Sequence, residues 1–161
     1  KEVPNDFDIV VTTNSGYPLD LNLYQTVKGM SAAAQIVRHN GTILCASECR
    51  DGIPDHGEYK QLLGSRDTPE ELLKMINTPG YNHHDQWQVQ IQAQIQLRAN
   101  VHLKSSYLTT EQILAAHLTP IDDLQKTLTE TINDLGKTAQ VCVLPMGPQT
   151  IPYVRNRMPN I

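Results

Sequence analysis

The stretch DIVVTTNSGYPLDLNLYQTVKGM, residues 8–30, contains a short apolar strand pattern, a turn and the start of a helix. β-Branched residues dominate 8–13, the turn holds Gly16 and Pro18, and apolar residues then return at helical spacing. Three further apolar stretches follow, with helical patterns between them: GTILCAS (41–47), NVHLKSS (100–106) and AQVCVLP (139–145). Nearly continuous hydrophobicity is typical of parallel strands buried on both faces. The sequence therefore predicts an α/β fold, in which a mostly parallel sheet of about four or five strands is flanked by helices in a layered sandwich.

The composition is that of a globular protein. The 161 residues suit a single domain over 1–161, and 39% of them are hydrophobic. The net charge of −4 and the lack of a Lys/Arg run argue against a nucleic acid partner. No apolar run reaches the ~18 residues of a membrane span, so we expect no membrane association. The three cysteines, Cys45, Cys49 and Cys142, cannot all pair, and reduced thiols fit a cytoplasmic protein best.

Capping residues mark the expected helix starts. Thr68 comes before Pro69 and Glu71, and Thr109 comes before Gln112, so both threonines are expected N-caps. Thr119-Pro120 predicts the start of a longer helix in the same way. That helix would pack through one apolar stripe and end at a glycine: Ile121, Leu124, Leu128, Ile132 and Leu135, then Gly136.

Residues 86–97, QWQVQIQAQIQL, carry two conflicting signals. Strict alternation of polar and apolar residues indicates a β-strand. Twelve residues are long for a strand, however, and Gln, Leu and Ala favour a helix. As a helix, the segment would carry two apolar stripes, Trp87/Ile91/Ile95 and Val89/Ala93/Leu97, and would need cover on both sides. The pattern alone leaves both structures open.

The first helix has a clear apolar face. After Asp20, the expected N-cap, a stripe at spacings of 4, 3, 4 and 3 must lie on the sheet: Leu23, Val27, Met30, Ala34 and Val37. Gln25 and Lys28 then lie on the opposite side, with Tyr24 beside them. They form either a solvated surface or, because the helix follows the carboxyl end of the first strand, a pair that could grip a carboxylate.

The histidines give weaker signals. His83-His84 is more simply a surface or N-cap pair than a metal site, because adjacent residues do not face the same way on a helix and ligand spacing is lacking. His56, in a loop after the second strand, is a candidate for lining a site. His102, inside a strand, is expected to be a structural histidine with its hydrogen bonds satisfied. Cys45-x-x-x-Cys49 has no further cysteine nearby and is a poor metal motif.

Four segments together resemble a known family. Residues 8–30, CRDGIPDHGEY (49–59), DQW (85–87) and VLPMGPQTIP (143–152) are similar, in order, to the C-terminal domain of the nickel-dependent lactate racemase family. The resemblance implies that the chain is the C-terminal half of a larger two-domain enzyme whose N-terminal catalytic domain is absent, and a start at Lys1 without Met agrees with that expectation. It also implies a helix over 85–97.

The same resemblance implies a reaction. In the family a nickel-pincer nucleotide, held between the two domains, accepts a hydride from Cα of a 2-hydroxy acid while a histidine takes the hydroxyl proton, and the hydride returns to either face of the keto acid. The catalytic histidines, the cofactor-holding lysine and the nickel ligand belong to the N-terminal domain. We therefore expect no catalytic residue, no metal ligand and no bound cofactor in this chain alone, which should be inactive.

By resemblance, this chain contributes Gln25, Lys28 and Tyr24 to substrate binding and Trp87 to the wall of the cofactor site. Lys28 and Gln25 would then be exposed in this chain, without a buried partner. The expected partners are the N-terminal domain and a small 2-hydroxy acid. The alternative is a non-catalytic binding or scaffold domain of the same fold. The end of the chain, RNRMPNI (155–161), has no family role that we can name.

Overall fold

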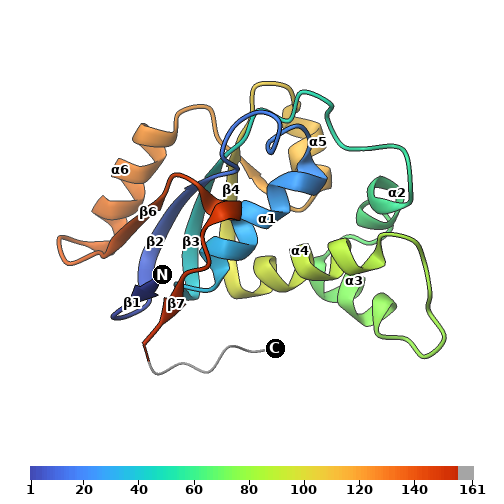
Figure 1. The fold of residues 1–161 in the computed structure, drawn as a ribbon, viewed down its shortest axis with the longest axis horizontal. Coiled ribbons are helices and arrows are strands. Elements are labelled where there is room, and N and C mark those ends of the chain that lie inside the picture. Colours follow the sequence, from blue (N-terminus) through green and yellow to red (C-terminus); the bar gives the residue numbers. More distant parts are fainter. Residues whose placement is uncertain (156–161) are drawn as a thin grey trace.

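A parallel sheet forms the centre of the protein, for which the computed structural model describes residues 1–155 (Figure 1). Five strands follow the order β5-β4-β3-β2-β6, and every neighbouring pair is parallel. Their bounds are β2 Phe7–Thr13, β3 Val37–Ala46, β4 Ala99–Lys104, β5 Thr119–Pro120 and β6 Val141–Leu144. The predicted α/β class and mostly parallel sheet are confirmed. We had not predicted β5 as a strand.

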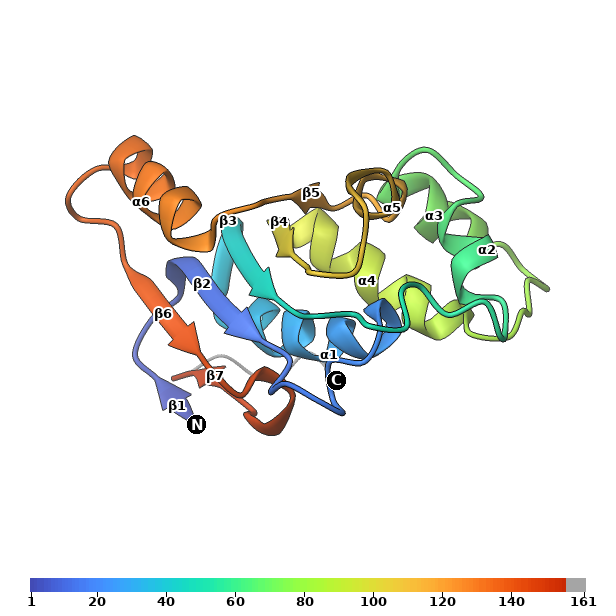
Figure 2. The ribbon, with the colours of Figure 1, turned by 90° about the horizontal axis from the view of Figure 1, so that it is seen from above.

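Helices cover both faces of the sheet. Their bounds are α1 Leu23–Ala34, α2 Tyr59–Leu63, α3 Pro69–Ile76, α4 Gln86–Arg98, α5 Thr110–Ala115 and α6 Leu124–Leu135. Figure 2 shows α1 on one side of the sheet and α6 on the other. Val10 and Ile43 belong to the large core on the α1 and α4 side, whereas Ile9, Val11 and Leu44 pack with α6. Burial on both faces explains the nearly continuous hydrophobicity of these strands.

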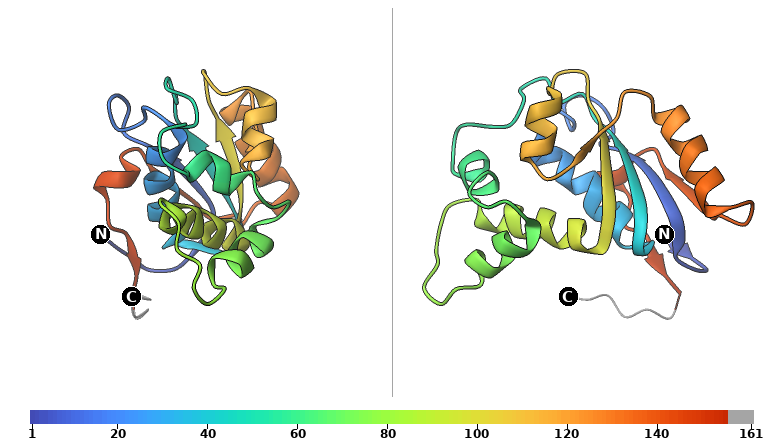
Figure 3. Two further views of the ribbon diagram at one scale, coloured as in Figure 1. Left: turned by 90° about the vertical axis from the view of Figure 1, so that its right-hand side faces the viewer. Right: turned by 180° about the vertical axis from the view of Figure 1, so that it is seen from behind.

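The helical layer extends beyond the edge of the sheet. The right-hand view of Figure 3 shows α2 and α3 at the end of α4 that lies away from the strands. On the opposite side of α1, a short 3₁₀ helix, η1 Gly147–Gln149, follows β6. β1 Glu2–Val3 and β7 Tyr153–Val154 then pair in parallel as a separate small sheet. No helix in the described part of the chain is long and apolar enough to cross a membrane.

The alternating segment 86–97 is a helix, as the family resemblance implied. Its glutamines at every fourth position form a polar stripe against neighbouring elements. Gln88 donates to the carbonyl of Tyr24 (2.6 Å), and Gln92, which is fully buried, donates to that of Ala116 (2.9 Å). Gln96 donates to the carbonyls of Ala116 and His117. Because these amides satisfy buried carbonyls, a helix with polar residues at alternate positions can be packed inside the protein.

Several predicted boundaries are corrected. Thr68 and Thr109 do cap α3 and α5, the latter in a full capping box with Gln112. Thr119-Pro120 does not begin a helix, because both residues pair with β4, and Asp123 caps α6 instead. The predicted stripe on α6 lies over the sheet, but Leu135 is exposed.

Two boundaries around α1 differ as well. Its N-cap is Asn22, whose side chain accepts the N–H of Gln25, and not Asp20 as predicted. The Asp20 carboxylate accepts the N–H of Glu48 instead. The helix ends at Ala34, and Val37 belongs to β3, because it pairs with Phe7 of β2. The C-terminal RNRMPNI lies outside the described residues except for Arg155, which forms an ion pair with Glu2 (2.6 Å).

Candidate substrate-binding face

The site is built around the first two turns of α1. Leu23, Val27 and Met30 are buried, so the helix presents its other side outward. Lys28 is exposed on this side, Gln25 is half-buried, and the Lys28 ammonium donates to the Gln25 side-chain oxygen (2.5 Å). Lys28 forms no ion pair with any residue in the described range 1–155. The prediction of exposure without a buried partner is confirmed for Lys28. For Gln25 the predicted exposure is wrong, because its side chain is half-buried, although its one side-chain partner within residues 1–155 is the exposed Lys28.

An aromatic pair lies next to these two residues. Trp87, at the start of α4, is 51% exposed and meets Tyr24 edge-on at 5.7 Å between ring centroids. The far side of Tyr24 meets the buried ring of Tyr59 at 5.2 Å. Burial, together with the nearby Asp85 carboxylate, raises the pKa of Tyr24, so its phenol stays neutral at physiological pH. The structure therefore brings Tyr24 and Trp87 together, one helical turn from Lys28.

A groove of about 320 Å³ begins at Lys28 and follows α1 toward its C-terminal end. Ser31 and Gln35 line its helix side, while Pro148 and Ile151 line the other. Its far wall is the segment from η1 to β7, which lies beside α1 in Figure 1. The sequence pattern alone does not predict this wall. The Gly147-Pro148 turn directly after the last strand was the signal that could have indicated it.

Two glycines allow that wall to approach α1. A Cβ atom on Gly147 would lie 2.5 Å from Thr12 Oγ1 and 2.9 Å from the Cα of Gly29. Two backbones therefore touch at this point, which no larger residue permits. The close contact sets the distance between η1 and the Lys28 side of α1.

Buried hydroxyls and a thiol tie α1 to the end of β3. Thr26 and Ser47 share a hydrogen bond of 2.6 Å, and the Cys49 sulfur lies 3.4 Å from the Thr26 hydroxyl. Burial raises the pKa of both Cys45 and Cys49, so these free thiols remain protonated. Cys142 is only half-buried, although the strand prediction favoured a buried thiol.

The loop that contains His56 is anchored near Trp87. The Asp85 carboxylate accepts the N–H of Glu58 (3.1 Å), and Gly57, at φ +83°, lies so close to Asp85 that a Cβ would overlap its carboxylate. His56 itself is exposed. Its role in lining a site stays a prediction, but the anchored loop lies at the Trp87 end of α4.

The other histidines lie outside the site. His83 and His84 are exposed and lie 3.2 Å from Glu58 and 3.1 Å from Asp85, respectively. The N-cap position of α4 is taken by Asp85 rather than by a histidine. His102 is not satisfied as we expected, because its buried Nδ1 has no hydrogen-bond partner in the described residues, and burial lowers its pKa. Within residues 1–155 no group of three or more His, Cys, Asp or Glu could hold a metal ion.

Comparison with known proteins shows which family this chain resembles. A family model described as the lactate racemase C-terminal domain matches residues 3–151. The lactate racemase of Lactiplantibacillus plantarum is 39% identical over 147 residues, which cover 88% of this chain and 34% of that protein. The lactate racemase of Thermoanaerobacterium thermosaccharolyticum is 34% identical over 146 residues, again covering 34% of its length. The chain thus spans about a third of the curated relatives it matches.

Solved structures show the same fold. The apoprotein of the Thermoanaerobacterium thermosaccharolyticum lactate racemase superposes with a TM-score of 0.83 at 30% identity, over 92% of this chain and 36% of that one. A Thermotoga maritima protein superposes with a TM-score of 0.60 at 12% identity over 96% of this chain, and shows the fold alone.

Proposed function

Since the chain belongs to the lactate racemase C-terminal domain family, we propose that it is the C-terminal domain of a racemase or epimerase that interconverts the stereoisomers of a small 2-hydroxy acid. One observation carries the proposal. Lys28 is exposed and free of ion pairs among the described residues, and it is paired with Gln25 beside the Tyr24–Trp87 aromatic pair. This arrangement offers one positive charge, one amide and an apolar wall on a single face.

The two polar residues suit a carboxylate. The Lys28 ammonium would neutralise the substrate carboxylate, which is common to all 2-hydroxy acids. Gln25 keeps its amide N–H donors available while its oxygen accepts from Lys28, so it would hold the second carboxylate oxygen. Two contacts of this kind define the orientation of Cα, and orientation contributes directly to the rate of a reaction at Cα–H.

The aromatic pair suits a planar cofactor. Trp87 presents about half of its surface, braced by Tyr24, and could lie against a nicotinate-derived ring while excluding water. In the full-length enzyme the nickel-pincer nucleotide would supply the hydride acceptor. The residues described here offer that group a wall, and its anchoring lysine and nickel ligand are proposed to lie in the N-terminal domain, together with the acid/base histidines.

The proposed partner is therefore the N-terminal domain of the same protein, and the present chain alone is proposed to be inactive. The relatives are about three times as long as the matched segment, which supports this division. We place the enzyme in the cytoplasm, because its three cysteines are free thiols, as in reducing compartments.

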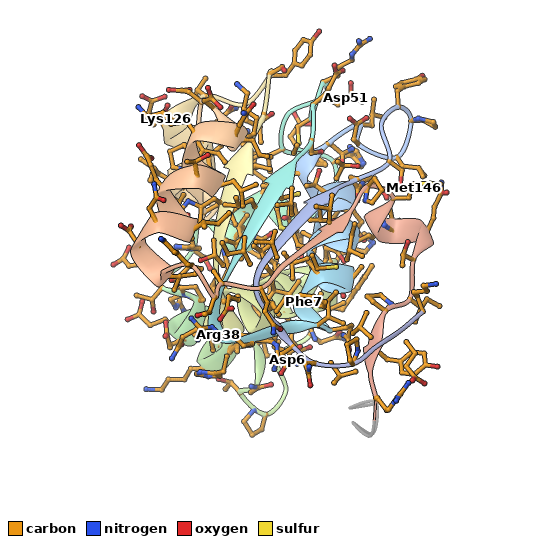
Figure 4. All side chains as sticks on the ribbon, turned by 90° about the vertical axis from the view of Figure 1, so that its left-hand side faces the viewer. Asp6, Phe7, Arg38, Asp51, Lys126 and Met146 are labelled. Atoms are coloured by element: carbon orange, nitrogen blue, oxygen red, sulfur yellow. The ribbon has the colours of Figure 1, made fainter. Side chains whose placement is uncertain are left out.

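Lys28→Ala in the full-length, cofactor-loaded enzyme tests the proposal. Loss of a charged partner of a bound carboxylate costs about 2–5 kcal/mol, so kcat/KM for lactate should fall about 30-fold or more, with a raised KM. The matched control is Lys126→Ala on α6, which Figure 4 shows on the side of the molecule opposite Met146 and η1. Lys126 is exposed, its one ion-pair partner among residues 1–155 is Glu130 at 4.0 Å, and its loss should leave the kinetics unchanged.

A panel of D- and L-2-hydroxy acids defines the reaction class. Exchange of stereochemistry without net oxidation identifies a racemase or epimerase. Equal kinetics for Lys28→Ala and the unmodified enzyme would refute the role of Lys28. A full-length protein that is inactive on the whole panel would favour the scaffold alternative, as would an unrelated domain upstream of residue 1.

A further inference from the structure

We infer that Asn14 is the residue that positions the Gln25–Lys28 pair. It does so by binding one rung of α1, which here means the carbonyl and the N–H that are joined by one backbone hydrogen bond of the helix. The inference rests on the proposed function of that pair. Asn14 follows β2 directly and is 1% exposed. A buried side-chain amide is costly unless each of its polar atoms has a partner, so its contacts indicate what it holds in place.

Each end of the Asn14 amide is bonded to one side of the same helical rung. Its nitrogen donates to the carbonyl of Gln25 (3.1 Å), and its oxygen accepts the N–H of Gly29 (3.0 Å). Gln25 and Gly29 are four residues apart, so they are the carbonyl and N–H that face each other in an α-helix. Asn14 therefore binds α1 at one defined turn.

This rung contains the substrate-binding residues. Gln25 is its first residue, and Lys28 immediately precedes its last. A shift of α1 by one residue would rotate both side chains by about 100° and carry them off the site. The contact with Asn14 opposes such a shift, because the next rung would bring Met30 to the place beside Asn14 Oδ1 where a Cβ atom does not fit.

The same amide also holds the preceding loop. The Asn14 nitrogen has a second acceptor in the carbonyl of Leu19. The β2–α1 loop and the helix are therefore joined through one side chain. Asn14 is buried and its side chain is bonded to backbone atoms, so it acts through Gln25 and Lys28 rather than on substrate.

Gly29 is the residue of α1 that allows the close contact with Asn14. A Cβ atom on Gly29 would lie 2.9 Å from Asn14 Oδ1 and 2.9 Å from the carbonyl oxygen of Thr13. Such contacts are too close for any side chain, so only glycine allows α1 to approach Asn14. Disruption of the contact from either side should have the same effect on the site.

The test is a double-mutant cycle in the full-length, cofactor-loaded enzyme. Asn14→Ser should lower kcat/KM for lactate about tenfold, mainly through KM, because the carboxylate grip is misplaced. In the Lys28→Ala background the same substitution should cost clearly less, about threefold or below, because only Gln25 is left to misplace. Thr68→Ala is the control: it removes the cap of α3, far from α1, and should lower stability without changing KM.

Gly29→Ala disrupts the same contact from α1 and can replace Asn14→Ser in the double-mutant cycle with Lys28→Ala. It tests the role of the contact if Asn14→Ser does not fold. If Lys28→Ala is too slow to assay, calorimetric dissociation constants for lactate complete the same cycle. Equal losses in both backgrounds would overturn the role of Asn14 and leave the proposed function intact. No effect of Lys28→Ala alone would instead refute the proposed role of Lys28, and a full-length protein inactive on every 2-hydroxy acid would mean that the proposed function has failed.

Discussion

Gln92 lies fully buried in α4 and is bonded at both ends of its amide. Its oxygen accepts from the Tyr59 hydroxyl, and its nitrogen donates to the carbonyl of Ala116 (2.9 Å). Gln94, two residues on, is exposed. The two residues belong to the same alternating pattern, and only their surroundings distinguish a structural glutamine from a solvated one.

Gln92→Leu should destabilise the protein by about 1–3 kcal/mol, because it leaves the buried Tyr59 hydroxyl without its acceptor and removes one of the two side-chain donors to the Ala116 carbonyl. Gln94→Leu changes the same side chain on the exposed face and should alter stability by less than about 0.5 kcal/mol. Urea unfolding followed by circular dichroism measures both. Similar midpoints for the two variants would contradict the structural role of Gln92.

The element α1 is held from three directions. Asn14 binds it at the end of β2, the hydroxyl of Ser47 binds it at the end of β3, and η1 touches it through Gly147. These attachments all lie at or near the carboxyl ends of the strands, where open α/β sheets bind ligands. The rigid placement of α1 explains how two flexible side chains, Gln25 and Lys28, can serve a defined geometry.

Gly147→Ala should push η1 away from α1, because the new Cβ would lie 2.5 Å from Thr12 Oγ1. We expect a loss of about 1–3 kcal/mol in the free energy of unfolding. Gly64→Ala is the matched control, since its nearest neighbour would be 3.6 Å away and its φ is −85°. Thermal unfolding of the two variants checks the difference, and an unshifted midpoint in Gly147→Ala would show that the contact can relax.

At the scale of the whole molecule, one large core on the α1 and α4 side contains most of the buried ionisable groups discussed above. Cys45, Cys49 and Tyr59 all belong to it, and burial raises the pKa of each. In the unfolded chain these groups ionise near their ordinary values. In the folded protein they remain neutral, so the folded state binds more protons at alkaline pH.

Global stability should therefore be complete below the ordinary thiol pKa of 9.0 and decline as pH rises above it. Each thiol contributes at most about 1.4 kcal/mol per pH unit, so we expect a loss of about 2–3 kcal/mol between about pH 8 and pH 10. Urea midpoints across this range measure the slope. Cys45→Ala should have a shallower slope relative to its own value at pH 7, and a flat profile for the unmodified protein would contradict the prediction.

Features that depend on neighbours along the chain can be predicted from the sequence. The four main strands, the caps at Thr68 and Thr109, and the outward position of Gln25 and Lys28 all follow from local periodicity and local hydrogen bonds. Helical spacing also places Tyr24 beside them, but it does not indicate the contact between Tyr24 and Trp87, because that contact joins residues far apart in sequence.

Features that need a partner remote in the sequence emerge only in the folded protein. The alternating pattern of residues 86–97 does not decide between strand and helix. The helix is possible because the glutamine amides donate to carbonyls of other parts of the chain, which the pattern does not reveal. Thr119-Pro120 forms a strand because it pairs with β4 at the edge of the sheet. Asp20 does not cap α1, because its carboxylate accepts the N–H of Glu48 instead. The role of Asn14 depends on Gly29, fifteen residues away. Local sterics and caps act between residues a few positions apart, so the sequence reveals them. Buried polar groups and strand edges form hydrogen bonds with residues remote in the sequence, which become neighbours only in the folded protein.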